Sequence, residues 1–446
     1  MAFDVRAFGA VGDGRVLETT ALQQAIDACH GAGGGTVLVP AGTYLTGTIY
    51  LKSHVTLRLE AGATLLGSPR REDYNPDDVF PENRVFAREQ VTGAHVVIAY
   101  RQQHVAIVGE GTIDGHSAAF FGPLPTDEIE RTYRRKRRNF PISEWRPGQM
   151  VFFCLCQDVA VRDVNLLNAP YWTLFLHGCR RVQIRGLQIT NPPQTANGDG
   201  IDLDCCQDVT VSDCLLESGD DCLTLRASVA ALGDDGQDCA NVVVTNCVLS
   251  SPCNAIRVGV GDGVVRDCTL SNVVVKESRT GLSIVSCYSE RQQHGARLLN
   301  LHFQNFVMDT IMPINLLLGP HAKPPGQIHN ISFANFHLLA RQGCFLGGNP
   351  GHRVSRLRLH DFDLRLTGGE VDPGFSAAHA SPGGGTRGIP SGLLISQVDD
   401  LQIDGLRVYW EDLTADWRQA LEIQDSVNVS LHRVEADPPP RVMPAD

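Results

Sequence analysis

Short runs of alternating apolar and polar residues recur along the chain from about residue 150 onward, each bounded by polar residues. The copies lie at 158–163, 181–186, 208–213 and 241–246, and later at 301–305, 331–335 and 357–361. Period-two alternation is typical of strands with one buried face. The first four copies are 23, 27 and 33 residues apart, and each interval holds a second short strand and turn residues. The pattern therefore predicts a repeat built of short strands.

A strand-only repeat of this length is typical of a β-solenoid. An antiparallel sandwich needs regular two-residue hairpin signals, and a doubly wound fold needs helices between its strands. The sequence shows neither pattern. We therefore predict an all-β fold, a single-stranded right-handed parallel β-helix. Equivalent positions of neighbouring coils then stack about 4.8 Å apart.

One amphipathic helix is expected near the start of the chain. Leu22, Ala25, Ile26 and Cys29 form one apolar stripe, and Thr20 with Gln23 has the spacing of a capping box. An open solenoid end exposes unpaired strand edges, which a helix can cover. We predict a short N-terminal capping helix.

The chain is expected to be a single β-helix domain spanning residues 1–446. Within it we assign an N-terminal cap and first coils (1–68), a basic loop insertion (115–150), the central coils that carry the candidate chemistry (150–340), and C-terminal coils with a tail (340–446). The basic run Arg131–Arg138 is either a solvated loop or a cleft wall. Residues 367–390 are rich in Gly, Pro, Ser and Ala and are expected to form a surface loop.

Composition narrows the classes of partner. The formal net charge of −12 argues against general nucleic-acid binding, which needs a basic face. No run of about 18 apolar residues is present, so no membrane partner is expected. The first residues lack a signal-peptide pattern, which favours a cytoplasmic location; the alternative is a periplasmic or secreted protein whose leader has been removed. The oligomeric state is left open.

The 14 cysteines include no CxxC pair of the kind that builds zinc sites. Several follow strand-like runs, as Cys214, Cys247 and Cys268 do. We expect buried free thiols stacked in a ladder, with disulfides or a metal site as alternatives. No cofactor and no metal are expected for the preferred function.

Two aspartate-rich segments, at 197–204 and 218–226, carry the candidate chemistry. If Ile201 and Leu223 both point into the core, Asp199 and Asp221 fall in one column, one coil apart, with Asp220 beside them. Carboxylates stacked this closely repel each other, so one tends to hold a proton. A protonated acid and an ionised base are what glycoside hydrolysis needs. Turn aspartates and a calcium site are the alternatives.

These segments resemble glycoside hydrolase family 28, the polygalacturonase family of right-handed, pectate-lyase-like β-helices. Residues 197–202, Asn-Gly-Asp-Gly-Ile-Asp, are similar to the family's Asn-Thr-Asp-Gly-x-Asp motif, and residues 219–222 match its Gly-Asp-Asp-Cys motif. Residues 8–14, 39–44 and 169–174 are similar to other family segments. The resemblance implies Asp220 as the general acid, Asp199 and Asp221 as the pair that activates water, and inversion at the anomeric carbon.

The sequence also departs from the family pattern. Gly198 replaces the motif threonine, and Asn254 occupies the place of the family histidine. The family's Arg-Ile-Lys, which recognises a galacturonate carboxylate, corresponds to residues 283–285, Ser-Ile-Val. Arg226 and Arg257 are candidates to replace those cations, because arginine binds carboxylates bidentately. These departures leave the identity of the sugar open, but they do not change the expected reaction class.

Further candidate substrate-binding residues lie near the motifs. Asn197, Asp202 and Asn254 belong to the segments or their column, and His177 and Trp172 lie one coil earlier. Trp172 either stacks on a sugar ring or packs in the core, and His177 either binds a hydroxyl or is a surface histidine. We predict a hydrolase that cleaves an α-glycosidic bond in a pectin-type or related oligosaccharide. The alternatives are a calcium-dependent polysaccharide lyase and a non-catalytic carbohydrate-binding solenoid.

Overall fold

The fold was analysed in a computed structural model of the chain. It describes residues 1–76, 80–83, 89–124, 139–287, 294–319, 326–367, 391–411, 419–436 and 441–442. The basic run Arg131–Arg138, residues 368–390 of the loop expected at 367–390, and most of the tail lie outside the described residues.

The backbone contacts divide the chain into two compact units. Unit 1 comprises Met1–Glu130, Arg138–Asp220 and Ala231–Gln237, and unit 2 includes Asp221–Ala230 and Asp238–Asp446. Each unit is described by itself. The prediction of one continuous domain stays a prediction.

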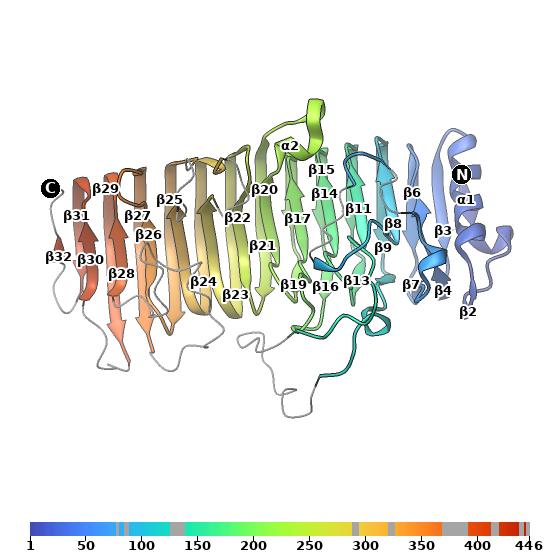
Figure 1. Ribbon diagram of the computed structural model, residues 1–446, viewed down its shortest axis with the longest axis horizontal. Coiled ribbons are helices and arrows are strands. Elements are labelled where there is room, and N and C mark those ends of the chain that lie inside the picture. Colours follow the sequence, from blue (N-terminus) through green and yellow to red (C-terminus); the bar gives the residue numbers. More distant parts are fainter. Residues whose placement is uncertain are drawn as a thin grey trace. The chain divides into compact units, whose positions relative to one another are not determined.

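Unit 1 is a stack of short parallel strands behind one helix, α1 (Thr19–Gly31), at its N-terminal end (Figure 1). Its strands are β1 (Ala2–Asp4), β2 (Asp13–Leu17), β3 (Gly35–Val39), β4 (Gly42–Thr46), β5 (Ile49–Tyr50), β6 (Val55–Leu59), β7 (Ala63–Gly67), β8 (Val97–Tyr100), β9 (Gln103–Gly109), β10 (Thr112–Asp114), β11 (Val151–Cys154), β12 (Gln157–Arg162), β13 (Asn165–Leu167), β14 (Leu174–His177), β15 (Arg180–Arg185), β16 (Gln188–Thr190), β17 (Ile201–Asp204), β18 (Gln207–Ser212) and β19 (Leu215–Glu217).

Unit 2 continues the same architecture with longer strands. They are β20 (Leu223–Ala227), β21 (Cys239–Ser250), β22 (Asn254–Gly261), β23 (Val264–Ser286), β24 (Arg297–Leu318), β25 (Gln327–Ala340), β26 (Cys344–Gly347), β27 (Val354–Leu366), β28 (Ser391–Ser396), β29 (Val398–Trp410), β30 (Gln419–Gln424), β31 (Val427–Glu435) and β32 (Arg441–Val442). A short helix, α2 (Val229–Leu232), follows β20. The predicted all-β class, a right-handed parallel β-helix with an N-terminal helix, is confirmed.

The repeated alternating runs stack in register from coil to coil, as the alternation predicted. In unit 1, Val159 pairs with Val182, and Val182 pairs with Val209 on the next coil. In unit 2, Leu301 pairs with Ile331, which pairs with Leu357. These apolar side chains are buried and fill the interior. Burial of one strand face against neighbouring coils therefore stabilises the fold.

The polar residues that bound each phrase turn the chain at the coil corners. Asp158, Asp208 and Asn241 at the start of their phrases have φ of 55°, 58° and 58°, and Asp213 and Asn246 at the end have similar values. Asp and Asn tolerate this left-handed conformation better than other residues with a side chain. The corners therefore explain why the phrases begin and end with these residue types.

Stacked thiols and rings fill much of the interior. All 14 cysteines lie in described residues and all are free; Cys253 alone is not fully buried. Cys156, Cys179 and Cys206, on successive coils of unit 1, each donate to a backbone carbonyl of the preceding coil at 3.2–3.4 Å. In unit 2, Phe306, Phe336 and Phe362 form a stack with ring centroids 4.9 and 5.3 Å apart. The predicted ladder of buried thiols is confirmed.

Helix α1 covers the first coils with the predicted stripe: Leu22, Ala25, Ile26 and Cys29 are fully buried. The predicted capping box is wrong, because Glu18 is the N-cap and no side chain caps the helix. Gln23 instead bonds Asp27 and the backbone of Tyr50. Among the described helices, none is long and apolar enough to cross a membrane.

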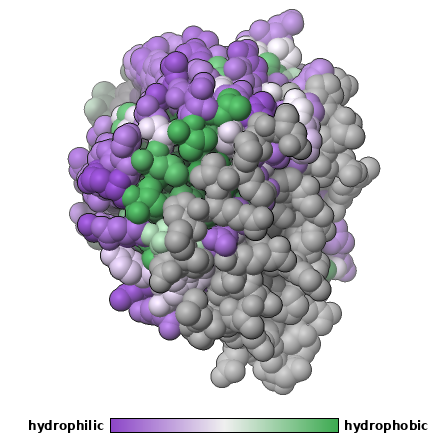
Figure 2. Space-filling model, turned by 90° about the vertical axis from the view of Figure 1, so that its left-hand side faces the viewer, coloured by the Kyte–Doolittle hydropathy of each residue, from purple (hydrophilic) through white to green (hydrophobic). Residues whose placement is uncertain are grey.

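The last described coils of unit 2, around β31, leave apolar side chains at the surface. Figure 2 looks onto the last coils of unit 2, where apolar side chains gather between polar ones. In β31, Val427 is exposed, and Val429, Leu431 and Val434 are half-buried. Within the described residues of unit 2, no helix comparable to α1 covers this end.

Candidate active site

The outer wall of unit 1 changes character along one column of side chains. Strand pairing puts Tyr50, Ile98, Phe152, Phe175 and Asp202 in register on five successive coils. Neighbouring coils are about 4.8 Å apart. The wall is thus apolar over four coils and becomes acidic at β17.

The apolar part of this wall is covered. Phe80 and Val91, from the segment before β8, belong to the same buried cluster as Ile98, Phe152 and Phe175. Ile98 and Phe152 are at most 1% exposed, and Phe175 is 6% exposed. Within the described residues, the outward rings of β11 and β14 are therefore almost completely shielded from solvent.

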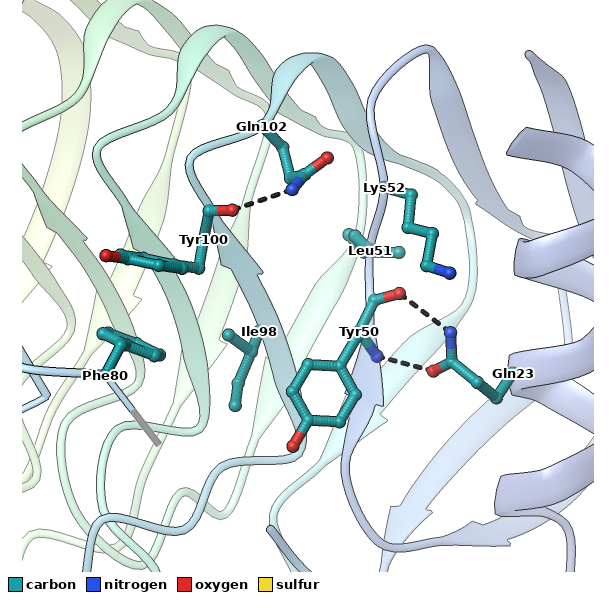
Figure 3. A pocket seen from close by; sticks show the side chains of 8 residues that line it. All are labelled: Gln23, Tyr50, Leu51, Lys52, Phe80, Ile98, Tyr100 and Gln102. Atoms are coloured by element: carbon teal, nitrogen blue, oxygen red, sulfur yellow. Dashed lines mark hydrogen bonds between the residues drawn. The ribbon is translucent and has the colours of Figure 1, made fainter. Parts of the chain in front are cut away.

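A pocket of about 480 Å³ lies at the N-terminal edge of the cover (Figure 3). Tyr50, Ile98, Phe80 and Tyr100 line it, and the rings of Phe80 and Tyr100 stack with centroids 4.2 Å apart. Lys52, which also lines it, is ion-paired with Asp27 at 2.7 Å. The pocket is mainly aromatic and lies three to four coils from Asp202 in the strand register.

Asp199 lies in the turn between β16 and β17, and this turn meets the one that carries Asp220. The carbonyl oxygen of Gly198 accepts hydrogen bonds from the backbone N–H of Gly219 (2.9 Å) and of Asp220 (3.3 Å). A β-carbon on Gly219 would lie 2.5 Å from the carbonyl oxygen of Thr195, so only glycine fits there. The two glycines therefore let the backbones of the two aspartate turns approach each other.

The buried side chain of Asn191 holds the same turn by hydrogen bonds. Its amide nitrogen donates to Thr173 Oγ1 (2.7 Å) and to the carbonyl oxygen of Gly198 (3.3 Å), and its amide oxygen accepts from the N–H of Ala169 (2.8 Å). The carbonyl oxygen of Asp199 accepts from the N–H of Thr173 at 2.9 Å. The backbone that carries Asp199 is thus held to the preceding coil. The Asp199 side chain is 5% exposed, whereas Asp220 is partly exposed.

Arg146, which sequence reasoning missed, is buried behind this turn. Its guanidinium donates to the carbonyl oxygens of Pro170 (2.9 Å), Ala196 (2.6 Å) and Glu89 (2.8 Å) and to Asn197 Oδ1 (3.2 Å). Its charged end lies 4.9 Å from the centre of the Tyr171 ring. Burial lowers the pKa of Arg146, and Tyr171, Glu89, Asp199 and Asp220 oppose that shift electrostatically. A single arginine in a loop insertion gives no sequence signal for this position.

The remaining candidates in unit 1 are buried. Trp172 packs against Tyr171 and Phe175, in agreement with the core alternative. His177 is 2% exposed rather than a surface histidine, and its Nδ1 lies 3.4 Å from Asp204 Oδ2. Asp202 is fully buried. These three side chains therefore lie beneath the surface of the wall and support it by packing.

In unit 2, Asp221 is held by two residues of the next coil. Asn254 Nδ2 donates to Asp221 Oδ1 at 2.6 Å, and Arg257 Nη1 donates to Oδ2 at 3.3 Å. All three residues are at most 5% exposed. Leu223 pairs with Ile256 and Leu225 with Val258, which confirms the register that placed Asn254 in the column of Asp221. Both contacts stabilise the ionised carboxylate.

Arg257 thus binds a carboxylate of the protein, although the sequence suggested a substrate anion. Arg226 is only partly buried. Arg257 pairs in the strand register with Thr224 on one side and Ser283 on the other. The arginine beside Asp221 opposes binding of a calcium ion there, and the nearby Cys253 thiol is not a ligand that calcium prefers.

Acidic turns on the outer wall of a parallel β-helix are the kind of site that carbohydrate-active solenoids carry, and comparisons with known proteins identify the group. The model of the glycosyl hydrolases family 28 matches residues 29–316. The chain belongs to this family.

Two curated relatives show the extent of the likeness. A probable polygalacturonase of Vitis vinifera is 29% identical over 288 residues, which cover 62% of this chain and 55% of the relative. An exo-poly-alpha-D-galacturonosidase of Dickeya chrysanthemi is 28% identical over 317 residues, which cover 63% of this chain and 51% of the relative. The chain therefore spans about half the length of these relatives.

A solved structure supports the fold over nearly the whole chain. The family 28 exopolygalacturonase of Yersinia enterocolitica superposes with a TM-score of 0.67 at 19% identity, covering 97% of this chain and 78% of that chain. At this identity the likeness concerns the fold.

Proposed function

We propose that the protein hydrolyses α-glycosidic bonds in pectin-type, galacturonate-containing saccharides, with inversion at the anomeric carbon. The observation that carries the proposal is the junction at Gly198, where the turns of Asp199 and Asp220 are hydrogen-bonded to each other. Asp221 directly follows Asp220 in the chain. The turns of Asp199 and Asp220 therefore adjoin each other within unit 1. Family membership and the names of the curated relatives support the substrate class.

The surroundings of the carboxylates favour different roles. Asp221 is buried and accepts bonds from Asn254 and Arg257, which suits a carboxylate that stays ionised and activates water. Asp220 is partly exposed, which suits an acid that reaches the leaving oxygen of a bound sugar. Asp199 completes the pair with Asp221 in this scheme.

We further propose that cleavage proceeds from a chain end. Next to the acidic coil, Phe80 packs against Phe152 of β11 and Trp172 packs against Phe175 of β14, and both outward rings are nearly fully buried. A polysaccharide therefore finds no free wall on that side of Asp202. The Dickeya relative carries the name of an exo-acting enzyme, which agrees with this proposal.

The test is digestion of polygalacturonate, rhamnogalacturonan and neutral α-linked oligosaccharides. The proposal expects release of mono- or disaccharides from the start, with the inverted anomer seen first by NMR. Asp220→Asn should lower kcat about 10³-fold and leave substrate binding largely intact. A retained anomer would contradict the three-aspartate scheme, and an ultraviolet-absorbing unsaturated product would indicate a lyase instead. Early fragments of mixed length would contradict attack from the end alone.

A further inference from the structure

Arg146 is the largest fully buried side chain in the described part of the molecule. The acceptors of its guanidinium are three backbone carbonyls and one side-chain amide. No carboxylate accepts a hydrogen bond from it within the described residues. Burying a charge without a directly bonded counter-ion costs several kcal/mol. Such a residue is retained where its charge or its geometry serves a purpose.

Two of the four acceptors lie in one turn. The carbonyl oxygen of Ala196 and Oδ1 of Asn197 belong to the segment between β16 and β17, two to three residues before Asp199. Asn197 has a left-handed backbone, with φ of 52°. Arg146 therefore fixes the unusual conformation that directs the chain into Asp199.

The other contacts lock the guanidinium itself. The carbonyl oxygens of Glu89 and Pro170 bind it, and the ring of Tyr171 lies against its charge. The hydroxyl of Tyr171 donates to the carboxylate of Glu89. Rotation of the side chain would break several of these contacts together. The positive charge is therefore held in one place behind the aspartate turns.

We infer that Arg146 is a positioning residue for the proposed reaction, which orders the Asp199 turn and holds a fixed positive charge behind the turns of Asp199 and Asp220. The inference rests on the proposed function. Two properties of the side chain act separately: its charge sets the pH range of activity, and its hydrogen bonds set the geometry. Lysine keeps the charge but cannot reproduce the fork of bonds, whereas methionine keeps only the bulk.

The experiment compares the pH dependence of kcat/KM for wild type, Arg146→Lys and Arg146→Met on a galacturonate oligosaccharide. Removing the cation makes the nearby carboxylates harder to ionise, so both limbs of the profile should move to higher pH in Arg146→Met, by about one unit. Arg146→Lys should keep the wild-type limbs while kcat falls 10- to 100-fold. Arg181→Met removes an exposed arginine of β15 and should leave the profile unchanged.

The outcomes separate the inference from the proposed function. A wild type without hydrolytic activity on any pectic saccharide contradicts the proposed function. With an active wild type, unmoved limbs in Arg146→Met overturn the inference, as does a shift in Arg146→Lys that equals the shift in Arg146→Met. If Arg146→Met does not fold by circular dichroism, Arg146→Lys alone still decides, because wild-type kcat in that variant contradicts the geometric role.

Discussion

At the scale of single residues, two buried arginines bind groups of the protein itself. Arg257 contacts Asp221, and Arg146 lies behind the turn that carries Asp199. Both arginines are at most 5% exposed. The opposite charges of Arg257 and Asp221 offset part of the cost of burying each other, whereas backbone carbonyls bind the charge of Arg146. The substrate must therefore be recognised by other groups than these two arginines.

The pair of Asp221 and Arg257 makes a stability prediction. Arg257→Met strands a buried carboxylate and should lower the free energy of unfolding by about 3 kcal/mol. The double variant Asp221→Asn with Arg257→Met should recover at least half of that loss, because no unpaired charge then remains. Urea denaturation of wild type, Arg257→Met, Asp221→Asn and the double variant measures the free energies of unfolding that this comparison needs.

The matched control is Arg181→Met, which removes an exposed arginine paired with Asp158. This substitution should lower the free energy of unfolding by less than about 1 kcal/mol. Equal losses for Arg181→Met and Arg257→Met would show that burial of the Asp221 pair has no special energetic weight.

At the scale of the elements, the coil corners combine backbone conformation with side-chain ladders. Asn305 has φ of 57° and donates to Asn272 Oδ1 at 2.9 Å, while its own Oδ1 accepts from Asn335 at 2.9 Å. The corner therefore uses both the tolerance of asparagine for positive φ and its amide.

Two substitutions separate these contributions. Asn305→Gly loses the ladder but keeps the backbone conformation, whereas Asn305→Ala loses both. We expect Asn305→Ala to destabilise unit 2 by about 1 kcal/mol more than Asn305→Gly. Thermal unfolding followed by circular dichroism checks the order, and the reverse order would refute it.

The segment that covers the apolar wall contains a buried histidine. Nδ1 of His95 lies 2.7 Å from the carbonyl oxygen of Gln149, and the ring packs 4.9 Å from Phe152. Burial lowers the pKa of His95 to about 4. The unfolded chain binds this proton near pH 6.5, before the folded protein does, so folding loses stability as pH falls from about 6.5 to about 4.

The expected loss from this histidine is about 3 kcal/mol over that pH range. His95→Gln should show a flatter dependence, while His337→Gln, at an exposed site, should follow wild type. Denaturant midpoints measured at several pH values test this. A slope in His95→Gln equal to that of wild type would assign the acid sensitivity to other groups.

At the scale of the whole molecule, nearly all thiols are shielded. Thirteen of the 14 cysteines are buried, and Cys253 is partly exposed with its sulfur 3.0 Å from Arg279 Nη2. Burial raises the pKa of Cys268 and Cys344 to about 12. A thiol reacts as its thiolate, so these sulfurs are inert in the folded state.

Titration with a thiol reagent should therefore label one cysteine quickly in the native protein and 14 in denaturant. Peptide mapping should place the native label on Cys253, and Cys253→Ser should abolish it. Rapid native labelling of several cysteines would contradict the packing described for the interior.

The sequence predicted those features that repeat. Alternation around Val159, Val182 and Val209 gave the strand register, because each coil must bury the same face. Matching Ile256 with Leu223 placed Asn254 in the column of Asp221, whereas the contact between Arg257 and Asp221 was not predicted. The capping box failed because the helix begins at Thr19 with Glu18 as its N-cap, so Thr20 lies inside the helix and Gln23 bonds Asp27 and Tyr50 instead. Arg146 could not be predicted, since its acceptors are backbone carbonyls that only the folded turns bring together.

The corner before β14 takes residues 168–173, whereas the corner before β17 takes residues 191–200 and is four residues longer. The strands on either side keep their pairing without a shift. Extra chain at this corner therefore bulges outward without disturbing the pitch, so the scaffold can acquire or lose chemistry by insertion alone. Loops at this corner can therefore vary in length while the paired strands keep the same register.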